Sequence, residues 1–240
     1  MNAKALLVTV MVSLSVAWTF AADWPWYYGP RRDSTSLEKG VLRTWPKEGP
    51  KVLWTAALGV GFGGPAVKDG KVYLLDRDEK IGDTLRVFDL ATGRALWTFA
   101  YDAPGSFMFP GSRTVPTIDG DLVYTVSAVG DLYAINTTTH KPVWHKNIWT
   151  DFGGSGVVPA LRMPRPGPGA APPPDPGRGG APGGTPPAPP DGRQGAPAAA
   201  GPSLPTWGIV QNPLVHGDLL IVAPQTPETT VVAFDKRTGE

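Results

Sequence analysis

The chain has 240 residues, with 22 basic and 21 acidic side chains, nine tryptophans and no cysteine. This balanced charge gives no reason to expect nucleic acid or an anionic membrane surface as a partner. The lack of cysteine excludes disulfides and a lipidated cysteine within this sequence. Stability must therefore come from a packed core.

The N-terminus has the three regions of a secretory signal peptide. Lys4 supplies the charge, residues 5–18 form an apolar core, and Ala21 and Ala22 are small residues suited to cleavage. The competing interpretation is a signal anchor, but the apolar run is shorter than the roughly 20 residues that a spanning helix needs. We therefore expect residues 1–22 to be removed, no stable membrane span, and a periplasmic or secreted protein.

Residues 23–50 are predicted to form an N-terminal arm that begins with the aromatic-rich sequence DWPWYYGPRRDSTS. Trp24, Trp26, Tyr27 and Tyr28 could be a platform for a carbohydrate or a quinone, since aromatic faces stack on rings. Alternatively, these aromatics pack against the folded domain, which is the interpretation we favour. The Arg31–Asp33 stretch is predicted to be a solvated turn.

A sequence repeat covers most of the remaining chain, with copies at 64–99, 115–148 and 212–240. In the first copy, Asp69-Gly70 predicts a tight hairpin, and 71–75, 84–90 and 95–99 are β-branched and aromatic runs typical of strands. A short strand precedes the hairpin. Four antiparallel strands recurring at about 40–50 residues are the unit of a β-propeller blade.

A signature, Asp89-x-x-Thr92-Gly93-x-x-x-Trp97 in the first copy, recurs along the repeat. It resembles the repeat of the quinoprotein dehydrogenase-like β-propellers, often called pyrroloquinoline-quinone (PQQ) repeats. Its structural positions are Trp54, Asp89, Thr92, Gly93, Trp97, Asn136, Thr139, Trp144, Asp235, Thr238 and Gly239. The resemblance implies an all-β propeller of four-stranded antiparallel blades, in a ring of about seven or eight. Asn136 and His140 depart from the aspartate and glycine of the family pattern.

The repeat also predicts how the blades divide the chain. Residues 51–158 are expected to hold the last strand of one blade, at 51–58 with Trp54, and two full blades. Residues 206–240 begin the next blade. Because propellers protect their edges by closing the ring, we expect this to be the N-terminal part of a longer protein.

A polar run, DRDEKIGD at 76–83, interrupts the first copy. Lys80 and Ile81 stand where an EF-hand loop needs a ligand and a glycine, so we predict a polar hairpin loop and not a calcium site. The three histidines are also not spaced as metal ligands. No metal-binding or catalytic residue is assigned from the sequence.

Arg113 is the one candidate ligand-binding residue. It lies in Pro110-Gly-Ser-Arg-Thr114, which resembles a GxRxTP step of the same family. Its planar guanidinium could face the central channel and bind an anion. Alternatively, it could pair with Asp102 or another loop carboxylate as a structural strut, which we favour because loop arginines usually find a local partner.

Residues 159–205 contain sixteen of the 28 prolines and no aromatic residue. Such a segment cannot bury enough apolar surface to offset its ordering entropy, which predicts disorder with polyproline-II character. It is either a spacer or a tolerated loop expansion, and the second is favoured because long surface insertions cost little stability.

Three function classes agree with the sequence. The first is an exported scaffold that binds protein partners or a small ligand, similar to the propeller of the outer-membrane β-barrel assembly machinery. The second, a quinoprotein alcohol or sugar dehydrogenase, would use PQQ and Ca²⁺, which only the family resemblance implies. The third is an extracellular carbohydrate-binding or sensor domain. We rank the scaffold first because fold resemblance alone does not establish an activity.

Overall fold

The computed structural model describes residues 22–155 and 203–240. The strands are β1 Ala66–Lys68, β2 Lys71–Asp78, β3 Gly82–Asp89, β4 Ala95–Ala100, β5 Thr117–Asp119, β6 Leu122–Val126, β7 Asp131–Asn136, β8 Pro142–Asn147, β9 Leu214–His216, β10 Leu219–Val222 and β11 Val232–Asp235. One short 3-10 helix, Thr150–Phe152, follows β8. The predicted signal peptide (1–22) and proline-rich insertion (159–205) fall almost entirely outside the described residues.

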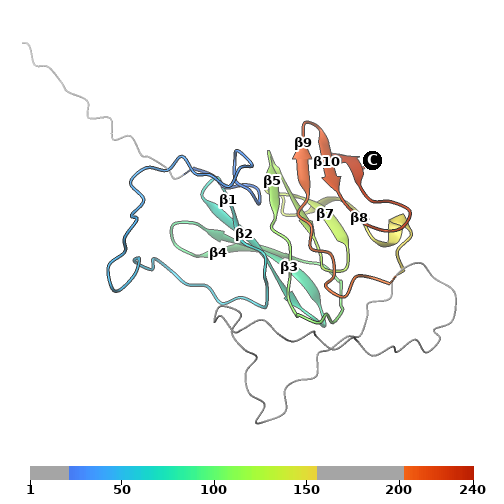
Figure 1. The fold of residues 1–240 in the computed structure, drawn as a ribbon, viewed down its shortest axis with the longest axis horizontal. Helices are drawn as coiled ribbons and strands as arrows, with labels where there is room; N and C mark the ends of the chain where they lie inside the picture. Colours follow the sequence, from blue (N-terminus) through green and yellow to red (C-terminus); the bar gives the residue numbers. More distant parts are fainter. Residues whose placement is uncertain (1–21, 156–202) are drawn as a thin grey trace, which may run out of the picture.

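The strands form three antiparallel sheets in the order of the chain (Figure 1). β1-β2-β3-β4 and β5-β6-β7-β8 are complete four-stranded sheets, and β9-β10-β11 is a three-stranded one. β1 lies beside β5, and β5 beside β9, so the first strands of the sheets are neighbours at the inner side. The prediction of an all-β propeller with four-stranded antiparallel blades is confirmed. The number of blades in a complete ring stays a prediction.

The apolar core lies between the sheets. Alternate residues along the strands of the middle sheet point to its two faces, one packed against the first sheet and the other against the third. Tyr124 and Leu132 pack in the cluster shared with the third sheet. Val123 and Ile135 pack in the cluster shared with the first sheet. All five residues of β6 are buried. Since successive side chains of a strand point to opposite faces, this explains why the strands are apolar on both faces.

The repeat signature builds the turn between the third and fourth strands. The carboxylate of Asp89 accepts hydrogen bonds from the backbone N–H and hydroxyl of Thr92, at 2.9 and 2.7 Å. Asn136 accepts in the same way from the N–H of Thr139, at 2.8 Å. Asp235 does so from Thr238, also at 2.8 Å. A short polar side chain that bonds the backbone in this way stabilises a tight turn.

Each repeat tryptophan packs on such a turn in the following sheet. Trp54 lies against Gly93 and donates from Nε1 to Leu90 O at 2.8 Å. Trp144 lies against Gly239 and donates to Lys236 O at 3.1 Å. Between them, Trp97 stacks on His140, with ring centroids 4.5 Å apart. Trp97 and Trp144 therefore join neighbouring sheets, and Trp54 joins the segment 51–58 to the first sheet.

The structure corrects the prediction for residues 76–83. The hairpin loop is confined to 79–81, because β2 continues to Asp78 and β3 begins at Gly82. Asp76, Arg77 and Asp83 are buried. The reason is that each of these charges has a partner, since Arg77 pairs with Asp83 and Asp76 pairs with Arg86.

Residues 51–58 also differ from the prediction, since they form no strand in the described structure. A strand needs a hydrogen-bonded neighbour, and no described strand lies beside this segment. Trp54 still contacts the first sheet in the way that Trp144 contacts the third. Within the described ranges, no helix is long and apolar enough to cross a membrane.

Candidate functional site

The N-terminal arm crosses the inner strands of all three sheets. Trp24 and Val67 of β1 exchange backbone hydrogen bonds of 2.8 and 2.9 Å. Ile118 of β5 donates its N–H to Pro25 O at 3.0 Å, and its carbonyl accepts from Trp26 Nε1 at 2.9 Å. Arg32 then donates to the carbonyl of Val215 in β9. The arm therefore binds the inner edges of the sheets.

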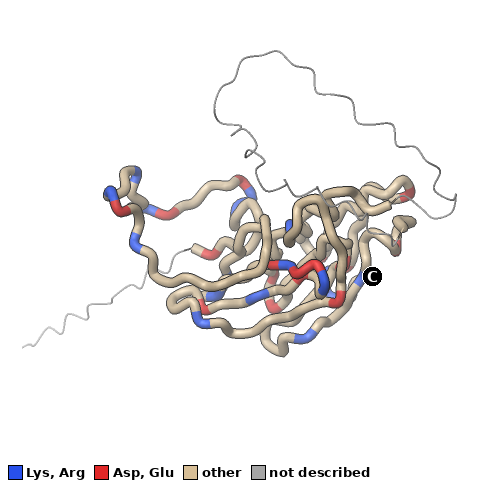
Figure 2. Tube along the Cα trace, turned by 90° about the horizontal axis from the view of Figure 1, so that it is seen from below, with Lys and Arg blue, Asp and Glu red and all other residues tan. Residues whose placement is uncertain are grey.

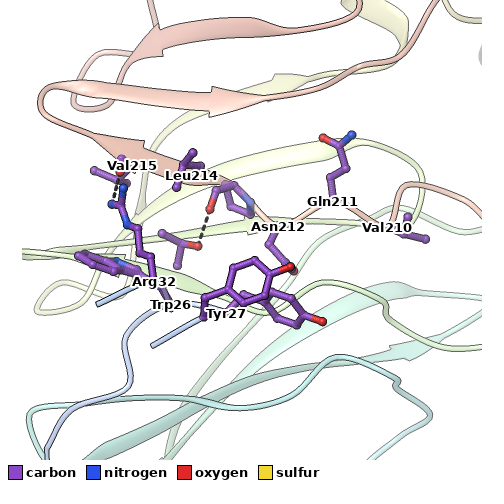
Figure 3. Close-up of a pocket in the computed structure, with 11 residues that line it drawn as sticks. Trp26, Tyr27, Arg32, Val210, Gln211, Asn212, Leu214 and Val215 are labelled. Carbon is purple, nitrogen blue, oxygen red and sulfur yellow. Dashed lines mark hydrogen bonds between the residues drawn. The ribbon is translucent and has the colours of Figure 1, made fainter. Parts of the chain in front are cut away.

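A tight turn gives the arm its shape. Gly29 has φ +75° and donates its N–H to Trp26 O at 2.9 Å. A Cβ at this position would lie 2.7 Å from the Trp24 ring, so only glycine fits. Figure 3 shows the Arg32 side chain extending from the arm to Val215, with Trp26 on one side and Tyr27 on the other. The guanidinium carbon of Arg32 is 4.3 Å from the centroid of the Trp26 ring, a cation–π contact.

A cavity of about 500 Å³ lies between the arm and the inner strands β5 and β9, and we call it the arm cavity. Its lining consists of Trp26, Tyr27, Tyr28, Arg32, Thr117, Val210, Gln211, Asn212, Pro213, Leu214 and Val215. Tyr27 and Tyr28 are 51% and 55% exposed, with ring centroids 4.6 Å apart. Such a volume and lining suit a small ligand or a side chain of a partner.

Most of the polar side chains that line the arm cavity are hydrogen-bonded to backbone groups. Gln211 Oε1 accepts from Ala223 N at 2.8 Å, and Asn212 Oδ1 accepts from Val115 N at 2.7 Å. The Thr117 hydroxyl donates to Pro213 O at 2.7 Å. Among the described residues of the lining, Arg32 is the only one that is charged at neutral pH, and no carboxylate or histidine lies beside it there to form an acid and base pair for proton transfer. The arrangement is suited to binding.

A second cavity of about 470 Å³ contains Arg113 and Trp207 in its lining. Arg113 donates to Phe109 O, and its guanidinium carbon is 5.6 Å from the centroid of the Phe62 ring and 5.5 Å from that of Phe107. Burial, followed by the charge of Arg77, lowers the pKa of Arg113. No ion pair joins Arg113 and Asp102 in the described structure. Arg113 instead contacts a backbone carbonyl and two aromatic rings. Binding of an anion by Arg113 stays a prediction.

The buried Arg77–Asp83 ion pair lies near this second cavity. Both side chains are fully buried. Arg77 also donates to Ala103 O at 2.8 Å, and Asp83 accepts from Ala128 N of the second sheet at 3.1 Å. Burial raises the pKa of Asp83, and the charge of Arg77 opposes that shift. Figure 2 shows that basic and acidic residues are interspersed along the trace. The pair links two sheets.

The described residues show no cluster of carboxylates for the calcium ion that the PQQ resemblance implies. They contain no group of three or more His, Asp or Glu side chains that could hold a metal ion. Calcium sites are built from several carboxylate and carbonyl oxygens. No step through PQQ or calcium is therefore derived.

Sequence reasoning identified the aromatics of the arm but not the arm cavity. It placed Arg32 in a solvated turn, whereas Arg31 and Asp33 form that turn, with an ion pair of 3.4 Å, and Arg32 reaches β9. Arg32 and Val215 are 183 positions apart, so no local pattern could join them. The repeat positions lie in turns and between sheets, and none of them lines the arm cavity.

Comparison with known proteins agrees with this fold. A model of PQQ-type repeats, described as outer membrane protein assembly factor BamB, matches residues 34–162. The chain belongs to this family. The predicted resemblance to PQQ-repeat propellers is thereby confirmed.

Individual relatives of this BamB-like chain are distant. The tetrathionate hydrolase of Acidithiobacillus ferrooxidans is 26% identical over 128 residues, which cover 52% of this chain and 25% of that protein. The structure of BamB from Moraxella catarrhalis is 16% identical with a TM-score of 0.40, covering 78% of this chain and 40% of that one. A europium-containing methanol dehydrogenase is 13% identical with a TM-score of 0.46, covering 79% and 26%. The chain thus spans less than half the length of each.

Proposed function

We propose that this protein is an exported β-propeller scaffold that holds a partner protein in the arm cavity. The observation that carries the proposal is the pair of half-exposed tyrosines, Tyr27 and Tyr28, fixed over the inner strands beside a cavity of about 500 Å³. Exposed tyrosines bury a large apolar area at little cost in side-chain entropy. Leu214 and Val210, 43% and 54% exposed, extend the apolar surface.

Export and a binding role have support from both the sequence and the family. The charged, apolar and small-residue regions around Lys4, 5–18 and Ala21 favour secretion to the periplasm or the exterior. The family model is that of an outer-membrane assembly factor, whose name describes a role in assembly. The charged groups Asp76, Arg77 and Asp83 are buried in internal contacts, which argues against a catalytic role for them.

A photo-crosslinking experiment tests the proposal. A benzophenone amino acid replaces Tyr28 in the full chain, which is produced with its native N-terminus in an exporting host. Leu42, an arm residue that is 56% exposed and outside the cavity, is the matched control position. We expect a discrete protein adduct at position 28 that Tyr27→Ser weakens, and none at position 42. Equal adduct patterns at both positions, or no adduct at either, would contradict the proposal.

A carbohydrate ligand is a second candidate, favoured by one observation. The oxygens of Gln211 and Asn212 accept bonds from the backbone, which leaves their NH₂ groups as donors beside the two tyrosine rings. Aromatic faces with amide donors suit a neutral sugar ring. Saturable binding of neutral oligosaccharides that is lost in Tyr28→Ala, without a protein adduct at position 28, would establish this candidate in place of the first.

A further inference from the structure

The inner strands present three equivalent residues to the arm. Val67, Ile118 and Val215 are each two positions after an aligned proline, and each is the middle residue of its strand. They pair with Val72, Val123 and Leu220 of the adjoining strands in the same register. In this register of an antiparallel pair, the N–H and C=O of the middle residue point away from the neighbour, as the arm bonds at Val67 show.

The arm provides hydrogen-bond partners for some, but not all, of the backbone N–H and C=O groups at these three residues. At Val67, both the N–H and the C=O are bonded to Trp24. At Ile118, the N–H is bonded to Pro25 O and the C=O to Trp26 Nε1. At Val215, Arg32 bonds the C=O, but within 22–155 and 203–240 no group accepts a hydrogen bond from its N–H. Val215 lines the arm cavity, so this donor is at the cavity wall.

A buried backbone N–H without a partner is rare, because its desolvation is costly. Val215 is only 4% exposed. Either water in the arm cavity or an acceptor of a bound partner can satisfy this N–H, and a peptide carbonyl on an extended chain has the required geometry. Since the arm already pairs with the edges of β1 and β5, a partner strand at β9 continues the same pattern.

We propose that the inner edge of β9 binds an extended segment of the partner protein. One of its backbone carbonyls accepts from the N–H of Val215. Because alternate side chains of a strand point the same way, an apolar side chain next to that carbonyl packs among Tyr27, Tyr28 and Leu214. This rests on the proposed function, and it names the partner's conformation: an extended peptide with apolar residues at alternate positions.

The test uses the full chain and a phage-displayed library of linear hexapeptides. Peptides enriched on the protein are synthesised and titrated into ¹⁵N-labelled protein, with Val215→Pro and Val215→Ala as matched variants. Proline removes the N–H, whereas alanine keeps it with a comparable loss of side-chain volume. A proline is tolerated in a strand where its N–H is outside the ladder.

We expect enriched peptides to have apolar residues at alternate positions and to shift the Val215 amide resonance strongly. Val215→Pro should bind them about three- to tenfold more weakly than Val215→Ala, which is the loss of one hydrogen bond. The wild-type amide shift keeps the test valid if the proline variant fails to fold.

The outcomes separate this inference from the proposed function. If no hexapeptide is enriched, or if peptides bind without moving the Val215 amide, pairing at β9 is refuted. A discrete Tyr28 adduct in the crosslinking experiment would then still support the scaffold. If that adduct is also absent, both the pairing and the scaffold function are refuted. Binding only of sugars would replace the peptide with the second candidate.

Discussion

The contact of Trp54 with Gly93 gives the sharpest test of how a repeat tryptophan holds the turn on which it packs. Gly93 has φ +70°, and a Cβ on it would lie 2.5 Å from Trp54 Cδ2. Gly70, in the β1–β2 hairpin, has nearly the same φ, +68°, but a Cβ there would meet nothing within 4 Å. Alanine at either position costs about 1 kcal/mol of backbone strain. Only at Gly93 must a neighbouring ring also move.

We therefore expect Gly93→Ala to destabilise the fold by about 2 kcal/mol more than Gly70→Ala. Overpacking costs about 1–3 kcal/mol, and displacement of the ring threatens the Trp54–Leu90 hydrogen bond as well. Urea unfolding followed by circular dichroism measures both variants. In a Trp54→Ala background the ring is gone and the difference should vanish. Equal losses in the two single variants, or a difference that persists without Trp54, would refute the reasoning.

Two further predictions concern buried and strained groups. Asp83→Ala should lower the free energy of unfolding by about 3–5 kcal/mol, because it leaves Arg77 buried without its counter-charge and Ala128 N without its acceptor. In the Asp83→Ala background, Arg77→Met should lower the free energy of unfolding by less than it does in the wild-type protein. Strictly additive losses in urea unfolding would contradict the ion pair. His140, at φ +60°, stacks on Trp97. His140→Ala should lower the free energy of unfolding by about 1 kcal/mol, and His140→Gly should lower it by less, since glycine relieves the backbone strain. Equal shifts of the melting temperature in the two variants would argue against strain.

Much of the fold could be predicted because the repeat encodes local structure. The Asp69-Gly70 hairpin and the turn that Asp89 and Thr92 form depend on residues within a few positions of one another. The apolar runs 71–75 and 84–90 likewise became parts of β2 and β3. Such patterns depend on short-range sterics and burial, which a single sequence displays.

The errors arose where distant residues decide the outcome. Asp76, the first residue of the polar run 76–83, is buried, and its carboxylate accepts hydrogen bonds from Arg86 Nε at 2.6 Å and Gly59 N at 2.5 Å. A polar run normally indicates a solvated loop, and only the folded arrangement shows that these charges are paired. The arm cavity was missed for the same reason, since Arg32 and Val215 come from opposite ends of the chain.

The arm can be understood from the hazard that a free strand edge presents. Unpaired backbone groups at an edge are a template for another chain. The arm uses Trp24 and Pro25 to occupy the edges of β1 and β5, but at β9 it supplies only the side chain of Arg32. An arm that served stability alone would gain by bonding the third edge fully. That it leaves one donor beside two half-exposed tyrosines is why we place partner binding at β9, and not at the two edges that the arm has already filled.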